Sequence, residues 1–209
     1  MPVITISRMF GAGGSQVAAQ VARELGWALL DNALIERVAV GLHLTPANVQ
    51  AIEERAPTLA ERIADTLAYS SQEMIAAPLG VPLPPTEQRI LEVTHRVIDD
   101  AVSRGPAVLV GRGAQAWLAS RRDALHVYCT SSRAACVERV AARESLSERE
   151  AGRLVDDVNR QRAEYVKRNW GREWGAAANY DLCVSTAWLG VDGAARLVAE
   201  VARRTLPHA

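Results

Sequence analysis

Lysine is almost missing from this sequence of 209 residues, since Lys167 is the one lysine among 24 basic residues. Cysteine is nearly as scarce. Cys129, Cys136 and Cys183 form no C-x-x-C pair and stand among apolar neighbours, so we expect three buried side chains in a reducing cytoplasm. The four histidines do not cluster in the sequence, which argues against a His/Cys metal site.

An excess of one charge and long apolar runs are missing as well. The chain has 24 acidic and 24 basic residues, and a formal net charge of zero argues against a nucleic-acid partner. No apolar run reaches transmembrane length, and the first residues lack a signal-peptide pattern, so we expect a cytoplasmic protein that does not bind membranes. With 49% hydrophobic residues, the composition predicts a single domain over residues 1–209, with room for an inserted lobe.

The clearest local pattern lies in residues 3–25. A β-branched apolar run, Val3–Ile6, is followed by a glycine-rich stretch and then by apolar residues at helical spacing. A strand, a glycine-rich turn and a helix in this order direct backbone N–H groups and the positive end of the helix dipole to one point, where phosphate binds well. We therefore expect a phosphate-binding site formed by Gly11, Ala12, Gly13, Gly14, Ser15 and Gln16.

This stretch departs from the P-loop pattern G-x-x-x-x-G-K-[ST] at two positions. With Gly13 aligned to the second glycine, Arg8 takes the place of the opening glycine and Gly14 that of the lysine, while Ser15 is kept. The lysine normally reaches the β- and γ-phosphates. Its loss leaves open a non-catalytic nucleotide- or phosphate-binding protein, or an ordinary glycine-rich turn of an α/β domain. A dinucleotide fold is disfavoured, because G-x-G-x-x-G needs a glycine at Gln16.

Predicted strands and helices alternate along the chain. Strands are expected at residues 3–7, 27–31, 107–110, 125–129 and 180–185, and helices at 14–25, 33–40, 45–55, 58–68, 86–104, 114–120, 133–143, 147–168 and 191–203. This alternation predicts an α/β fold with a five-stranded parallel sheet covered on both faces. The Pro- and Gly-rich residues 76–85 favour a loop, and residues 42–85 are expected to form an inserted lobe over the site.

Polar side chains and glycines follow three of the predicted strands where these end. Ser7 and Arg8 end the first strand, Asp31 ends the second, and Gly111 and Arg112 follow the third. Open parallel sheets bind their ligands beyond the carboxyl ends of the strands. The sequence therefore predicts that these residues meet at one ligand-binding edge.

Together these stretches resemble the cytidylate kinase-like family of P-loop proteins over nearly the whole chain. ITISRMFGAGGSQVA is similar to the family's opening, where the lysine is also commonly absent, and VLVGRGA is similar to its third strand and turn. LLDNALIERVA resembles a segment that carries an acid and, six positions on, an arginine for the acceptor nucleotide. ARESLSEREA and NRQRAEYVKR resemble an arginine-bearing lid, and NWGREWGAAANYDLCVSTAWLG resembles a signature of this branch.

The resemblance implies a three-layer P-loop NTPase-type fold and transfer of a phosphoryl group from ATP, with Mg²⁺, to a nucleoside monophosphate, first of all CMP or dCMP. Ser15 would meet Mg²⁺, unless it caps the first helix. Asp31 would bind the acceptor's sugar or base and Arg37 its α-phosphate, unless Arg37 lies on a solvated helix face. Arg112 would bind phosphate or form a structural salt bridge. A kinase of another small molecule is the alternative, because the 42–85 lobe would determine the acceptor and its sequence indicates no particular substrate.

The resemblance also implies that a lid, residues 143–175, clamps the transferring phosphoryl group with Arg143, Arg162 and Arg168. Taken alone, each of these arginines also fits a solvated helix face. Lys167 is a further hypothesis, as a substitute for the P-loop lysine. A homodimer is compatible with the sequence but is not predicted by it.

Other charged and aromatic residues of this region have simpler interpretations. Asp156 and Arg160 are spaced for an ordinary i,i+4 ion pair. Trp170 and Trp174 either stack on a base or, as we favour, pack the lid loop onto the body.

Overall fold

The computed structural model describes residues 1–31 and 87–206. The helices expected within 33–68, the 42–85 lobe and Arg37 lie outside the described residues. Inside them, the order of elements follows the expected alternation of strands and helices.

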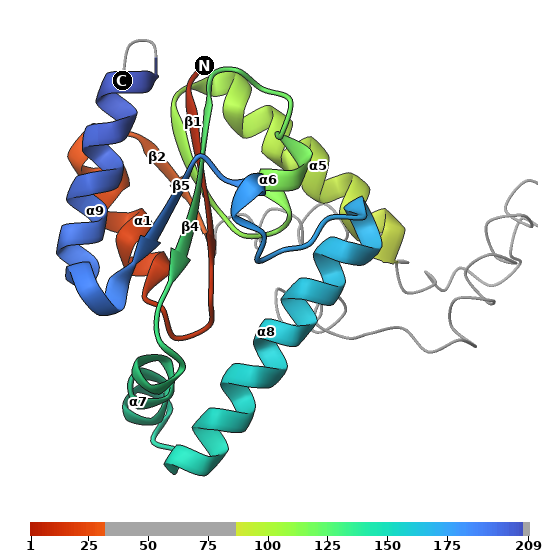
Figure 1. Ribbon diagram of the computed structural model, residues 1–209. Helices are drawn as coiled ribbons and strands as arrows, with labels where there is room; N and C mark the ends of the chain where they lie inside the picture. Colours follow the sequence, from red (N-terminus) through yellow and green to blue (C-terminus); the bar gives the residue numbers. More distant parts are fainter. Residues whose placement is uncertain (32–86, 207–209) are drawn as a thin grey trace, which may run out of the picture.

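The described residues are organised around a five-stranded parallel sheet (Figure 1). Its strands are β1 (Val3–Arg8), β2 (Ala28–Leu30), β3 (Ala107–Val110), β4 (Ala124–Thr130) and β5 (Leu182–Ser185), in the order β2-β3-β1-β4-β5. Val3 pairs with Ala107 on one side and with Ala124 on the other, so the central strand starts level with both neighbours. The expected α/β fold with a five-stranded parallel sheet is confirmed.

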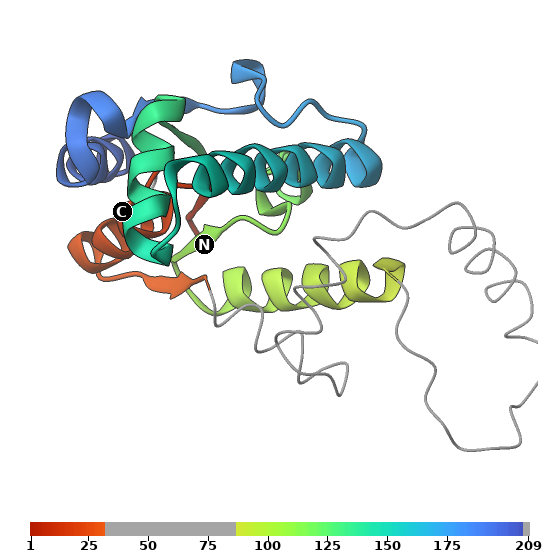
Figure 2. The ribbon, with the colours of Figure 1, turned by 90° about the horizontal axis from the view of Figure 1, so that it is seen from below.

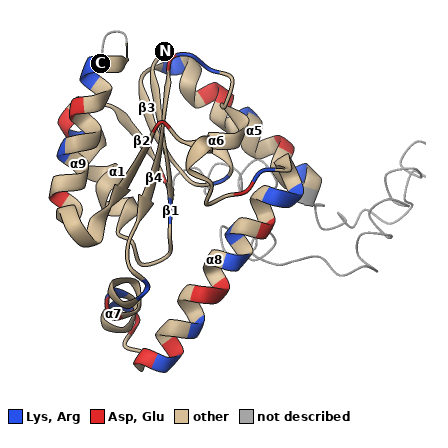
Figure 3. Cartoon of the chain, viewed as in Figure 1, with Lys and Arg blue, Asp and Glu red and all other residues tan. Residues whose placement is uncertain are grey.

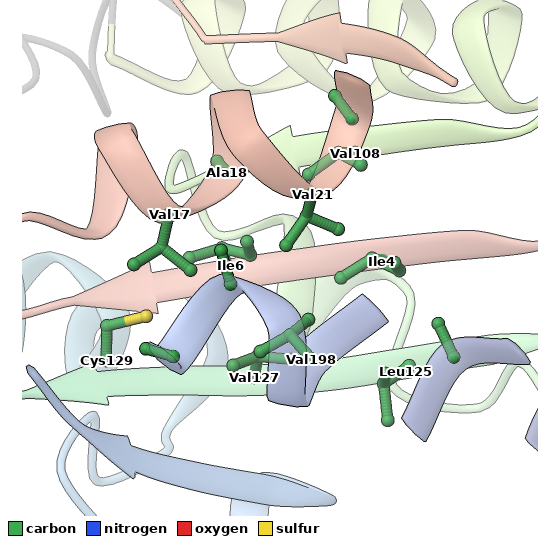
Figure 4. Packing of buried hydrophobic residues seen from close by; sticks show 14 of the residues in the cluster. Ile4, Ile6, Val17, Ala18, Val21, Val108, Leu125, Val127, Cys129 and Val198 are labelled. Carbon is green, nitrogen blue, oxygen red and sulfur yellow. The ribbon is translucent and has the colours of Figure 1, made fainter. Parts of the chain in front are cut away.

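Helices cover both faces of the sheet. On one face lie α1 (Gly14–Leu25) and α9 (Thr186–Thr205), and on the other lie α5 (Glu87–Arg104) and α6 (Ala114–Trp117) (Figure 1). Strand residues alternate between the faces. Ile4 and Ile6 accordingly pack against Val17, Val21 and Val198 of the first pair of helices (Figure 4), whereas Val3 packs with residues of α5.

Two further helices, α7 (Arg133–Glu144) and α8 (Glu148–Trp170), lie beyond the carboxyl ends of the strands (Figures 1 and 2). Each begins at a serine cap. The side chain of Ser132 accepts a hydrogen bond from the amide of Ala135, and Ser147 forms a capping box with Glu150. The apolar faces of α7 and α8 pack together with the segment between β1 and α1. This hydrophobic cluster contains Ala12, Cys136, Val137, Val140, Ala151 and Val155.

Two smaller expectations are wrong. Cys183 is exposed, because alternation in edge strand β5 points Val184 into the core and Cys183 to the opposite face. The last helix has a kink at Gly190, whose φ is 68°, so a short helical segment from Thr186 precedes the helix expected from residue 191.

The expected Asp156–Arg160 pair is the second wrong expectation. Asp156 instead forms an ion pair with Arg133 of α7, and Arg160 forms one with Asp157, so α7 and α8 are joined by a charge contact that spacing along α8 alone does not predict. Among the described helices, none combines the length and the apolar run that crossing a bilayer requires.

Candidate active site

The turn between β1 and α1 has the backbone of a phosphate-binding loop. Gly11 and Gly13 adopt positive φ values of 81° and 74°, which favour glycine. A Cβ atom on Gly11 would also lie 2.7 Å from the backbone oxygen of Cys136. Gly13 is the N-cap of α1 and makes no side-chain cap bond, so Ser15 does not cap this helix. Ser15 and Gln16 are both exposed in the first turn of α1.

The carbonyl groups of this turn are held by hydrogen bonds from the protein body. Arg139 of α7 donates to the backbone oxygen of Gly11 at 3.1 Å and to the hydroxyl of Thr186 at 3.2 Å. The Thr186 hydroxyl donates in turn to the backbone oxygen of Ala12 at 2.7 Å. Because the first amides of a helix have no acceptor within it, the turn retains N–H groups for an anion at the start of α1.

Helix α8 is fixed directly to the same turn. The amide of Phe10 donates to the side-chain oxygen of Asn159 at 2.8 Å, and Arg162 donates to the backbone oxygen of Arg8, also at 2.8 Å. The guanidinium groups of Arg143 and Arg162 lie 5.1 and 5.6 Å from the centre of the Phe10 ring, within cation–π range. The turn and the arginine-bearing helix therefore form one packed unit.

A cleft opens between this unit and the ends of β1, β2 and β3. Its empty volume, open solvent included, is about 1020 Å³. Its lining comes from five separate parts of the chain and includes Ser7, Arg8, Asp31, Gly111, Arg112, Gln161, Arg162, Tyr165, Trp174 and Tyr180. The strand-end residues that the sequence predicts to meet thus line one cleft.

Arg112 is held in an unusual position in this cleft. It has a positive φ of 55° between Gly111 and Gly113. Burial lowers the pKa of its guanidinium to about 10; Tyr165 and Asp31 oppose this shift, and the charge of Arg8 adds to it. Arg112 therefore stays charged at neutral pH, at a cost that an anionic ligand would offset.

Aromatic side chains form one wall. Trp170 packs so closely on Gly113 that a Cβ there would lie 2.7 Å from Cζ2 of the indole ring and closer still to Cη2. The Trp170 ring contacts Tyr165 at a ring-centre distance of 5.5 Å. Trp174 lines the cleft and meets Tyr128 edge-on at 5.4 Å. Its backbone oxygen accepts a hydrogen bond from the hydroxyl of Tyr180 at 2.7 Å. Trp170 thus has the packing role that we favoured, whereas Trp174 faces the ligand space.

Comparison with known proteins identifies the architecture. A model of the family described as cytidylate kinase-like matches residues 3–187. The chain belongs to the cytidylate kinase-like family. Membership supports a small-molecule kinase and leaves the acceptor undetermined. No curated protein sequence matches the chain.

Solved structures of related fold have low sequence identity. An uncharacterized protein from Eubacterium ventriosum is 19% identical with a TM-score of 0.70, covering 97% of this chain and 99% of its own. Shikimate kinase from Bacteroides thetaiotaomicron is 12% identical with a TM-score of 0.53, covering 97% and 98%. TT1252 from Thermus thermophilus is 20% identical with a TM-score of 0.54, covering 97% of each chain. These likenesses show a P-loop kinase fold.

Not every arginine predicted for the lid of this cytidylate kinase-like chain lines the cleft. Arg162 does, whereas Arg143 is exposed and pairs with Glu144 at 2.8 Å. Arg168 is half-buried in the last turn of α8, and Lys167 beside it is exposed. Roles for Arg143 and Arg168 in catalysis stay predictions. Figure 3 shows basic and acidic residues interleaved along α8, so this helix presents no uniformly basic face.

Several residues of the site were not predicted as such from the sequence. Arg139 lies one helical turn before Arg143, and that spacing indicates a shared face but not its contact with the turn. Thr186 is a polar residue directly after a strand, and polar residues at such positions often contribute to a site. Asn159 carries no recognisable signal within its helix.

The residues of the β1–α1 turn fit a nucleoside triphosphate with Mg²⁺. The turn offers backbone amides at a helix start, and the exposed Ser15 hydroxyl is adjacent to them. The described ranges contain no group of three or more His, Cys, Asp and Glu side chains that could hold a metal. Mg²⁺ needs no such group when substrate phosphates and water supply most of its ligands.

Proposed function

We propose that this protein transfers the γ-phosphoryl group of ATP, with Mg²⁺, to a nucleoside monophosphate, with CMP or dCMP as acceptor. The observation that carries this proposal is the shared cleft. The carboxylate of Asp31 and the guanidinium groups of Arg112 and Arg162 border one cleft. Arg8, which leads from β1 into the phosphate-binding turn, lines the same cleft. Positioning two phosphate-bearing substrates and stabilising the transferring charge is what phosphoryl transfer requires.

The donor side is formed by the turn and α1. The amides of Gly11 and Gly13–Ser15 would hold the donor's phosphates, and Gln16 would border them. The expected amide of Ala12 instead donates to the backbone oxygen of Met9 at 3.1 Å. The hydroxyl of Ser15 would be the protein ligand of Mg²⁺, which supplies positive charge at the β- and γ-phosphates when bound. The hydrogen bonds from Arg139 and Thr186 keep the turn in the shape that this role needs.

The acceptor side is formed by the ends of β2 and β3. Asp31 would accept hydrogen bonds from the acceptor's sugar or base, and Arg112 would bind its phosphate through two parallel N–H groups. Arg37, outside the described residues, is proposed as a second phosphate ligand. The carboxylate and the buried arginine border the same cleft.

The reaction breaks the bond between the γ-phosphorus and the oxygen that bridges to the β-phosphate, and the electron pair leaves with ADP. A bond forms to an acceptor phosphate oxygen, which carries no proton to remove when it is ionised. Arg162 would stabilise the spreading negative charge; its hydrogen bond to the backbone oxygen of Arg8, which holds it beside the turn, supports this role. Arg143 and Arg168 are proposed to join it when substrates bind.

A kinase of a different anionic small molecule is the second candidate. The observation that favours it is the charge of the cleft, whose lining includes three arginines (Arg8, Arg112 and Arg162) and the carboxylate of Asp31. Guanidinium groups bind carboxylates as well as phosphates.

A coupled assay of ADP formation with a panel of nucleoside monophosphates tests the proposal. We expect turnover that depends on Mg²⁺ and is fastest with CMP or dCMP. Turnover only in the presence of another small anionic metabolite would favour the second candidate. Calorimetry that shows tight ATP binding, together with no turnover at enzyme concentrations where a control kinase is fast, would reject both and indicate a nucleotide-binding protein.

A further inference from the structure

The two departures from the P-loop pattern lie in contact in the folded chain. A Cβ atom built on Gly14, the position of the missing lysine, would lie 2.8 Å from Cγ of Arg8 and closer still to its Cβ. Gly14 does not have the positive φ of its neighbour Gly13, so its backbone conformation does not demand glycine. Glycine is required at this position by the contact instead, because the stem of Arg8 occupies the space that any side chain at residue 14 would need.

The head of Arg8 extends from there toward the acceptor side of the cleft. A Cβ built on Gly111 would lie 3.1 Å from Cζ of Arg8 and closer still to Nη1, and Asp31 lies 4.0 Å from Nη2. The side chain of Arg8 is 21% exposed and lines the cleft. Its positive charge therefore lies between the phosphate-binding turn and the ends of β2 and β3.

We propose that Arg8 replaces the P-loop lysine as the cation that binds the terminal phosphate of the donor, and that Gly14 is required because it accommodates the arginine. The two substitutions then form one exchange, in which the cation moves from the start of α1 to the end of β1. A guanidinium also offers a planar pair of N–H donors, which an ammonium lacks. This inference rests on the proposed function for its donor.

The location of Arg8 supports its role as a replacement for the P-loop lysine. The backbone oxygen of Arg8 is held by Arg162 at 2.8 Å, so the strand end that carries the cation is fixed to the lid helix. Lys167 is exposed in the last turn of α8 and does not line the cleft. Arg8 is thus the basic residue closest in sequence to the turn and in contact with the lysine's position.

Calorimetric titration with inorganic tripolyphosphate and Mg²⁺ tests the assignment without any need for turnover. We expect Arg8→Ala to weaken binding by about 10- to 100-fold, the range of a lost charge-assisted hydrogen bond. Arg8→Lys keeps the stem on Gly14 and should weaken binding less. The double variant Arg8→Gly with Gly14→Lys, which restores the P-loop pattern, should recover most of the affinity. Arg160→Ala, on the exposed side of α8, is the matched control and should bind like the wild type.

The packing itself has a separate readout. Gly14→Ala should lower the urea midpoint of the wild type, because its methyl group meets Cβ and Cγ of Arg8, and should leave the midpoint of Arg8→Gly, which lacks both atoms, unchanged or higher. An equal effect in both backgrounds would overturn the exchange.

Two binding results would also overturn it: wild-type affinity in Arg8→Ala, or no tripolyphosphate binding by the wild type. If the expected binding pattern holds while no acceptor is ever phosphorylated, the assignment of Arg8 stands and the proposed kinase activity fails.

Discussion

The carboxylate of Asp31 lies 4.0 Å from the guanidinium of Arg8, and the two side chains are equally exposed at 21%. A negative charge so close to the cation partly neutralises the cleft while no substrate is bound. The pair thus joins the end of β2, on the acceptor side, to the strand that leads into the phosphate-binding turn.

Replacing this carboxylate separates its two effects. We expect Asp31→Asn to lower kcat/KM for the nucleotide acceptor by about 10- to 100-fold, because a charged hydrogen-bond acceptor is lost. The same change should strengthen tripolyphosphate binding, since the cleft becomes more positive. Steady-state assays and calorimetry measure the two effects, with Asp157→Asn on the exposed side of α8 as the control. An Asp31→Asn enzyme with unchanged kcat/KM would remove Asp31 from the site.

The hydroxyl of Ser15 can be tested through its metal. Since Gly13 and not Ser15 caps α1, Ser15→Ala should leave the thermal midpoint within the error of the measurement. ATP binding in the presence of Mg²⁺ should weaken about tenfold, while binding in EDTA should not change. Equal weakening in both conditions would mean that the hydroxyl contacts ATP itself rather than Mg²⁺.

Thr186 links the turn to the last helix and is buried, with 1% of its surface exposed. We expect Thr186→Val to lower the free energy of unfolding by about 1–3 kcal/mol, because the buried carbonyl of Ala12 loses its donor. Thr186→Ser retains the hydroxyl and should lose less. Urea unfolding followed by circular dichroism compares the two. A valine variant at least as stable as the serine variant would show that the hydrogen bond contributes nothing.

Stability should also fall in mild acid. Burial lowers the pKa of His126, against the attraction of Asp181, and burial likewise lowers the pKa of His95. The unfolded chain then takes up protons below the ordinary value of 6.5 while the folded chain does not. The free energy of unfolding is therefore intact above that pH and decreases as the pH falls from 7 to 5, by at most about 1.4 kcal/mol per pH unit for each histidine.

Substitution identifies the groups responsible. His126→Gln keeps a partner for the hydroxyl of Thr5, which lies 2.7 Å from the ring nitrogen of His126. Urea midpoints between pH 5 and 8 should depend less on pH in this variant, and less again when His95→Gln is added. A pH dependence that neither substitution alters would locate the effect elsewhere.

Much of the sheet and its helices follows from local patterns. The predicted bounds of helix α1, residues 14–25, match the structure, and α7 and α8 each begin at a serine cap of the kind that sequence encodes locally. Caps and apolar periodicity act through neighbours a few residues away, so the sequence carries them directly. The family resemblance, confirmed over residues 3–187, predicted the rest of the architecture.

The site was only partly predictable, because its decisive contacts join distant residues. The sequence shows that Arg8 and Gly14 both depart from the P-loop pattern, but only the fold shows that one side chain fills the space of the other. Arg139 and Arg143 share a helix face by spacing, yet the first holds the turn and the second lies at the surface. Trp170 packs on Gly113 whereas Trp174 lines the cleft, and the course of the loop between them determines this difference.

The contacts that shape the phosphate-binding turn also determine when it can form during synthesis. Gly11, Phe10 and Ala12 receive their partners from residues 128, 149 and 174 positions further along the chain. A ribosome has therefore translated most of the message before the opening segment can acquire its final shape. The opening segment therefore folds without these contacts until the last strand and the start of α9 have emerged from the ribosome.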